Sequence, residues 1–119
     1  IYVKEILRLI DRNLINGCAN ITGGGLADNI KRVIPDNFVA EINLNKIKTL
    51  KIFKWLKKTG IKEDEMLKTF NCSVGFCIII NPKNVKKVNK YFSKKFKPYV
   101  IGKISKRAER VKISGKIKW

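Results

Sequence analysis

Four consecutive residues near the start of the chain have the types and spacing that would bind a small anion. They are Thr22, Gly23, Gly24 and Gly25, and we call them the glycine loop. Glycine lets the backbone approach a ligand closely and adopt positive φ angles. The apolar run Cys18–Ile21 before the loop predicts a strand, and an apolar stripe in Leu26–Ile34 predicts a helix after it. Peptide N–H groups at such a junction suit an anion, and above all a phosphorylated metabolite.

The alternative for the glycine loop is a tight turn between strand and helix that holds no ligand. The loop is neither a nucleotide P-loop nor a Gly-x-Gly-x-x-Gly fingerprint, because the required lysine and spacing are missing. Asn29 and Arg32 lie four and seven residues after Gly25, so they share roughly one helical face with the end of the loop. A phosphate held by the loop could therefore also meet an amide and a guanidinium.

A second candidate group lies in the segment Thr69–Gly75. Asn71 stands at the mouth of a predicted central strand, Cys72–Ile80, where ligands of α/β sheets often meet the protein. Gly75 within that strand predicts a close backbone approach. The alternative interpretation is the start of a strand followed by a glycine that serves packing only.

Three consecutive acids, Glu63, Asp64 and Glu65, could in principle bind magnesium. We interpret them instead as the favourable first turn of a helix, because neighbouring side chains on a helix point in different directions. The chain has no histidine, which excludes a Ser-His-Asp or Cys-His site. We therefore expect no catalytic residue and no metal ligand in this chain, and a binding half-site at most.

The composition leaves a nucleic-acid-binding module open as an alternative. The 119 residues include 27 basic and 9 acidic ones, for a net charge of +18, and such an excess suits a polyanion. Lysine, isoleucine and asparagine share A/T-rich codons, however, so genome composition alone can produce this balance. We interpret Trp55 and Trp119 as core residues, not as a platform for stacking bases.

Alternating helical and strand patterns predict one α+β domain over residues 1–119, with a mixed, largely antiparallel sheet packed with helices. No apolar run approaches the ~20 residues of a membrane span, and the three cysteines are expected to be reduced, mostly buried thiols. The last two strands are expected to form a closing hairpin. The helices are expected at 2–14, 26–34, 50–58, 61–70 and 85–96, and the strands at 18–21, 38–44, 72–80, 99–104 and 110–117.

Several segments together resemble the phosphoribosylformylglycinamidine cyclo-ligase family, the aminoimidazole ribonucleotide (AIR) synthetases. The segment Ile21–Pro35 is similar to that family's "TGGG…N-I-x-R-V-L-P" motif. Further similarities, in the family's order, are Ile1–Val3 with the start of its C-terminal domain, Phe53–Leu56 with its "F-x-W-L" helix, Glu65–Cys72 with its "E-M-x-R-T-F-N" segment, and Tyr99–Gly102 with a strand near its end.

The resemblance implies a cytoplasmic, homodimeric ligase of purine biosynthesis that uses ATP and Mg²⁺ to close the imidazole ring of formylglycinamidine ribonucleotide. It also implies an N-terminal domain, absent from this sequence, that supplies most contacts to ATP and the metal. The only methionine is Met66, so we expect a piece of a longer polypeptide, inactive alone. The resemblance carries the role of substrate binding to Thr22, Gly23, Gly24, Gly25, Asn29, Arg32 and Asn71.

The sequence departs from the family pattern at three positions. Asn20 stands where the family usually has histidine, Ser73 where it has glycine, and Phe76 where it has methionine or a similar residue. Asparagine can still form hydrogen bonds, but it cannot act as a cation or as a general acid near neutral pH. The departure at Asn20 therefore leaves proton transfer from that position unsupported.

Overall fold

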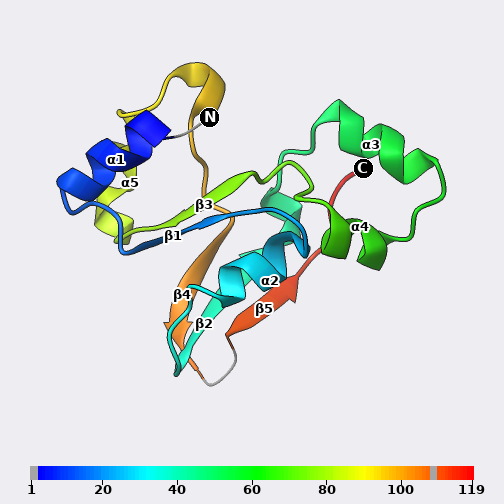
Figure 1. Ribbon diagram of the computed structural model, residues 1–119, viewed down its shortest axis with the longest axis horizontal. Helices are drawn as coiled ribbons and strands as arrows, with labels where there is room; N and C mark the ends of the chain where they lie inside the picture. Colours follow the sequence, from blue (N-terminus) through cyan, green and yellow to red (C-terminus); the bar gives the residue numbers. More distant parts are fainter. Residues whose placement is uncertain (1–2, 108–109) are drawn as a thin grey trace. The chain divides into compact units, whose positions relative to one another are not determined.

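The computed structural model describes residues 3–107 and 110–119 and confirms the α+β class (Figure 1). The chain divides into two compact units. Unit 1 combines the N-terminal segment up to Cys18 with Ile78–Tyr99, and unit 2 combines Ala19–Cys77 with Val100–Trp119. The expected similarity of the first residues to a domain start falls partly on Ile1 and Tyr2, which lie outside the described residues.

The elements follow one another in the expected alternation of helices and strands. Their bounds are α1 (Val3–Asp11), β1 (Gly17–Asn20), α2 (Gly25–Lys31), β2 (Phe38–Asn43), η1 (Leu44–Lys46), α3 (Lys51–Lys58), α4 (Glu63–Thr69), β3 (Phe76–Ile79), η2 (Pro82–Asn84), α5 (Val85–Asn89), η3 (Lys94–Phe96), β4 (Gly102–Lys106) and β5 (Val111–Ser114).

Unit 2 is built on a three-stranded sheet in the order β4-β2-β5 (Figure 1). Strand β2 runs antiparallel to β4 and parallel to β5, so that Ala40 lies opposite both Ile104 and Val111. Helix α2 contacts both β5 and α4. The core of this unit includes Val39 and Met66, both completely buried.

The expected closing hairpin is wrong, because β4 and β5 pair with the two edges of β2 and not with each other. Strand β2 explains this arrangement. It buries Val39, Ala40 and Ile42, and a strand so apolar is stable only when both of its edges are paired and its faces covered.

A two-stranded sheet joins β1 and β3. In unit 1, the Asn16 N–H donates to the Ile79 carbonyl at 2.8 Å, and in unit 2 the Ile21 N–H donates to the Gly75 carbonyl at 3.0 Å. The residue numbers rise along one strand as they fall along the other, so the pair is antiparallel. Within the described residues β3 has only this neighbour, and the expectation of a central strand there is wrong.

The expected strand also begins too early, since Cys72 and Ser73 have φ angles of 50° and 81°. These values belong to a turn, in which the Asn71 Oδ1 accepts a hydrogen bond from the Ser73 N–H at 3.0 Å. The interpretation of Trp55 as a core residue is wrong as well. Its side chain is 60% exposed, and none of the eight residues of α3 is buried.

Unit 1 contains α1 and the segment that carries α5, and it buries Leu9 and Val88 almost completely. The single helix expected over residues 85–96 is wrong, because α5 ends at Asn89 and only short turns flank it. Lys83, Lys86, Lys87 and Lys90 crowd this segment. Like charges three and four residues apart destabilise a helix, which accounts for its shortness.

Candidate functional site

The glycine loop connects β1 to α2, and its conformation requires glycine at two of three positions. Gly24 and Gly25 have φ angles of 95° and 74°, in the left-handed region that residues with a side chain rarely adopt. The Gly25 N–H donates to the Thr22 carbonyl at 3.1 Å and closes the turn. Thr22 and Gly23 are exposed at its outer edge.

Packing adds a second requirement at Gly25. A Cβ atom there would overlap the carbonyl oxygen of Leu67 and lie 2.9 Å from the Leu67 carbonyl carbon, so the start of α2 touches the backbone of α4. A Cβ on Gly23 would meet nothing within 4 Å, and its φ is not positive. Neither packing nor backbone conformation explains Gly23, which leaves it as the glycine most open to a ligand.

Asn29 lies inside the loop and not at its surface. It is 5% exposed, and its amide nitrogen lies 2.6 Å from the Gly25 carbonyl oxygen, 3.2 Å from that of Thr22 and 3.3 Å from that of Gly23. The Thr22 hydroxyl donates to its Oδ1 at 3.4 Å. The sequence placed Asn29 near the loop, but it could not show that the amide turns toward the loop carbonyls.

Two charged side chains lie at different distances from the glycine loop. Arg32 is exposed and follows the last residue of α2. Seven residues of helical rise, roughly 10 Å, therefore separate it from Gly25 at the start of the helix. The Asp28 carboxylate lies beside Gly24, with Oδ2 3.1 Å from the place of a Cβ there. Sequence reasoning overlooked Asp28, although its spacing of four residues from Gly24 was the available signal.

The structure brings the segment around Asn71 next to the glycine loop. The hydrogen bond between Ile21 and Gly75 and the contact between Gly25 and Leu67 fix the two segments on both sides of the loop. Asn71 itself is half-buried, and its Oδ1 is engaged with the Ser73 N–H. The amide nitrogen of Asn71 takes no part in that hydrogen bond.

Ser73 stands in a backbone conformation that suits glycine better than serine. Its φ of 81° is strained for serine. The Ser73 Oγ accepts a hydrogen bond from the Leu50 N–H at 2.7 Å, which ties the turn to the start of α3. This hydrogen bond compensates for part of the backbone strain.

Cys72 and Cys77 are not activated thiols in this structure. All three are free thiols. Burial raises the pKa of Cys77 to about 12, and burial together with the negative charge of Glu63 raises the pKa of Cys72 to about 11. Cys72 is buried and its Sγ donates to the Met66 carbonyl at 3.3 Å, whereas Cys18 and Cys77 are half-buried. The expectation of mostly buried thiols holds fully only for Cys72.

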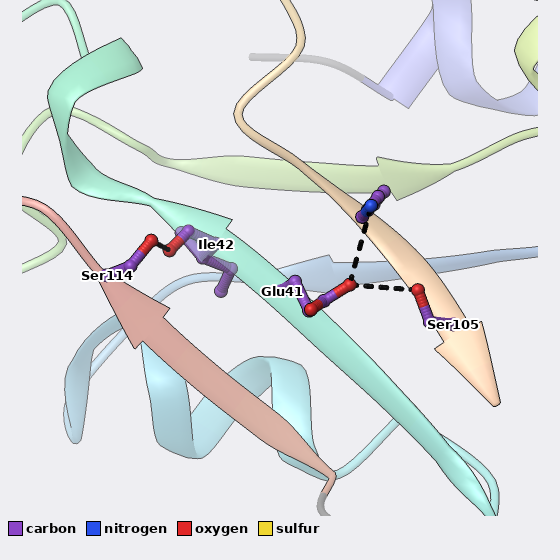
Figure 2. A network of polar contacts seen from close by, with 5 residues as sticks. Glu41, Ile42, Ser105 and Ser114 are labelled. Atoms are coloured by element: carbon purple, nitrogen blue, oxygen red, sulfur yellow. Dashed lines mark hydrogen bonds and ion pairs between the residues drawn. The ribbon is translucent and has the colours of Figure 1, made fainter. Parts of the chain in front are cut away.

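A second polar face lies on the three-stranded sheet (Figure 2). The Ser105 hydroxyl donates to the Glu41 carboxylate at 2.9 Å, and the Lys103 ammonium lies 3.9 Å from it. The hydrogen bond from Ser105, followed by the nearby positive charges, lowers the pKa of Glu41. These contacts join β2 to β4 across the sheet, and we interpret them as structural cross-strand pairs.

Two negative findings concern the described residues only. Within residues 3–107 and 110–119, no three His, Cys, Asp or Glu side chains lie close enough together to hold a metal ion. No helix in that part of the chain has the length and apolar character needed to cross a membrane. The acids Glu63, Asp64 and Glu65 form the first turn of α4, as the sequence indicated.

Comparison with known proteins assigns the family. Residues 1–114 match the family model described as AIR synthase related protein, C-terminal domain. The chain is 44% identical over 110 residues to a phosphoribosylformylglycinamidine cyclo-ligase of Streptococcus agalactiae, which covers 92% of this chain and 32% of that protein. It is also 44% identical over 111 residues to the Bifunctional purine biosynthetic protein PUR2,5 of Pichia angusta, covering 92% of this chain and 14% of that protein.

The chain thus spans about a third or less of the length of the curated relatives it matches. The matched part of the chain contains the glycine loop, Asn29 and the segment around Asn71. The family model covers nearly the whole chain, residues 1–114. The chain therefore belongs to the family of AIR synthase related proteins and represents its C-terminal domain.

Proposed function

We propose that this chain is the substrate-side C-terminal domain of an ATP-dependent ligase that converts formylglycinamidine ribonucleotide to AIR in purine biosynthesis. The observation that carries the proposal is the 44% identity, over 92% of the chain, to proteins named phosphoribosylformylglycinamidine cyclo-ligase. In this proposal residues 1–119 are one domain of a longer two-domain enzyme. The longer enzyme is a cytoplasmic homodimer, and the chain alone is inactive.

The proposed substrate site is the glycine loop with its neighbours. Its residues are Thr22, Gly23, Gly24, Gly25, Asn29, Arg32 and Asn71. The loop suits the substrate phosphate, because within the described residues the peptide N–H groups of Gly23 and Gly24 have no recorded hydrogen-bond acceptor. A phosphate accepts charge-assisted hydrogen bonds from such groups. Arg32, at the far end of α2, would meet a more distant part of the substrate.

ATP and Mg²⁺ enter the proposal as ligands of the absent N-terminal domain. The described residues do not fit a Mg²⁺ site, which requires several oxygen ligands around one point, since no cluster of acids forms there. ATP bound by the N-terminal domain would supply the phosphoryl group that activates the formyl oxygen of the substrate. The residues of this chain would bind and orient the ribonucleotide beside it.

The proposal is tested by measuring AIR formation from formylglycinamidine ribonucleotide with the full-length protein that carries this chain. We expect ATP-dependent product formation, and its absence from well-folded protein would contradict the proposal. Binding of duplex DNA to the same protein is measured as well, because the net charge of +18 would also suit a nucleic acid. Tight DNA binding that weakens steeply with salt, without AIR formation, would favour the nucleic-acid-binding module instead.

A further inference from the structure

Asn29 has the most constrained polar side chain in the described part of the chain. It is the only polar side chain among those residues that is buried, at 5% exposure. Its amide group contacts three carbonyl oxygens of the glycine loop at 2.6–3.3 Å. A buried amide is expected to be fully hydrogen-bonded, so the side chain and the loop hold each other in one arrangement.

This arrangement fixes the direction of two peptide groups. A trans peptide is planar, and its carbonyl and N–H point in opposite directions. The carbonyls of Thr22 and Gly23 point toward the Asn29 amide. The N–H groups on the same two peptides belong to Gly23 and Gly24, and they must therefore point away from Asn29. Neither of these two N–H groups has a hydrogen-bond acceptor among the described residues.

We propose that Asn29 is a positioning residue that turns the Gly23 and Gly24 N–H groups toward the substrate phosphate and does not itself touch the substrate. This inference rests on the proposed function of the loop. Asn29 holds the carbonyls inward through its amide nitrogen, and the Thr22 hydroxyl on its Oδ1 fixes the orientation of that amide. The loop then presents donors outward without rearranging when the ligand arrives.

The substitution Asn29→Asp tests this role, because it keeps the size of the side chain and replaces the donor by an acceptor. A carboxylate repels the three carbonyls, so the two peptides are expected to rotate. The matched control is Asn45→Asp. Asn45 is exposed in the same unit, and its Oδ1 accepts a hydrogen bond from the Lys116 N–H at 3.0 Å, a function that aspartate retains.

The measurement is the affinity of the full-length protein for formylglycinamidine ribonucleotide and for the corresponding riboside, which lacks the phosphate. We expect Asn29→Asp to weaken ribonucleotide binding about tenfold or more, the effect of losing charge-assisted hydrogen bonds. Riboside binding should stay within about twofold, and Asn45→Asp should change neither. A purely structural role would weaken both ligands equally, and that result, or an unchanged preference for the ribonucleotide, would overturn the inference.

A second measurement uses the unmodified protein, so it does not depend on the variant folding. In full-length protein labelled with [15N]glycine, the ribonucleotide should shift the amide signals of Gly23 and Gly24 far more than the riboside does. Unaffected signals at saturating ribonucleotide would overturn the positioning role. If the wild-type protein binds ribonucleotide and riboside equally, the proposed phosphate site is wrong. If the wild type prefers the ribonucleotide and Asn29→Asp keeps that preference, only the positioning role of Asn29 is wrong.

Discussion

The substitution Gly25→Ala should destabilise the protein severely, for two reasons that add. The φ of 74° costs a residue with a side chain roughly 1–2 kcal/mol. The added Cβ would overlap the Leu67 carbonyl oxygen and lie 2.9 Å from its carbon, and relieving such overpacking costs roughly 1–3 kcal/mol. The sum, roughly 2–5 kcal/mol, is a large part of a typical free energy of unfolding of about 5–15 kcal/mol.

Urea unfolding of wild type and three alanine variants measures this effect. Gly24→Ala should cost roughly 1–2 kcal/mol, because its φ is 95°, whereas an added Cβ would meet only the exposed side chain of Asp28 and no backbone atom. Gly23→Ala should cost no more than about 0.5 kcal/mol, because a Cβ there meets nothing within 4 Å. A Gly25→Ala protein within about 1 kcal/mol of wild type, or equal costs at all three positions, would refute this reasoning.

Three further predictions follow from the charges, thiols and strained turn described above. Asp28→Asn should strengthen ribonucleotide binding to the full-length protein roughly threefold, since a carboxylate about 6 Å from a phosphate in water repels it by about 0.7 kcal/mol. The matched variant Asp11→Asn should have no effect, and an equal gain there would mean that only net charge matters. Because the pKa of Cys77 is raised from 9.0 to about 12, the unfolded thiol loses its proton first, so the free energy of unfolding should fall as pH rises above 9.0. Cys77→Ala should make that fall shallower in unfolding titrations, and parallel curves would contradict the assignment. Ser73→Ala should destabilise the protein by about 1 kcal/mol through loss of the hydrogen bond from Leu50. Ser73→Gly should be nearly neutral, because relief of the strained φ offsets that loss, and a Ser73→Gly protein as unstable as Ser73→Ala would show that the φ is not strained.

Local sequence patterns were sufficient for most elements of the fold. The strand expected at 38–44 is β2 almost to the residue, because alternation of apolar and polar side chains over six residues has few other solutions. The helix with acids in its first turn is α4. Both patterns depend only on residues within one element, and these residues are adjacent in the sequence.

Patterns that depend on distant partners were less informative. The pairing of β4 and β5 with opposite edges of β2 depends on which edges remain open after the sheet assembles. The exposure of Trp55 depends on what packs against α3, and the aromatic residue alone does not show it. In the same way, the turn at Cys72 and Ser73 interrupts a run whose β-branched and aromatic residues predict a strand.

The candidate site shows the same division. The glycine loop was visible in the sequence because three glycines in a row are unusual, and the spacing placed Asn29 beside it. The direction of the Asn29 amide, the contact of Gly25 with Leu67 and the position of Asp28 were not visible. Each depends on side-chain or backbone directions that are fixed only when α2 packs against α4.

The central claim is that the glycine loop binds the substrate phosphate, and Gly23→Val in the full-length protein tests it most directly. Space around Gly23 is open and its φ is not positive, so the free energy of unfolding should change by no more than about 0.5 kcal/mol. The valine would nevertheless cover the adjacent N–H groups. We expect the rate of AIR formation at limiting ribonucleotide to fall at least about tenfold. Wild-type activity in the stable variant would contradict the claim.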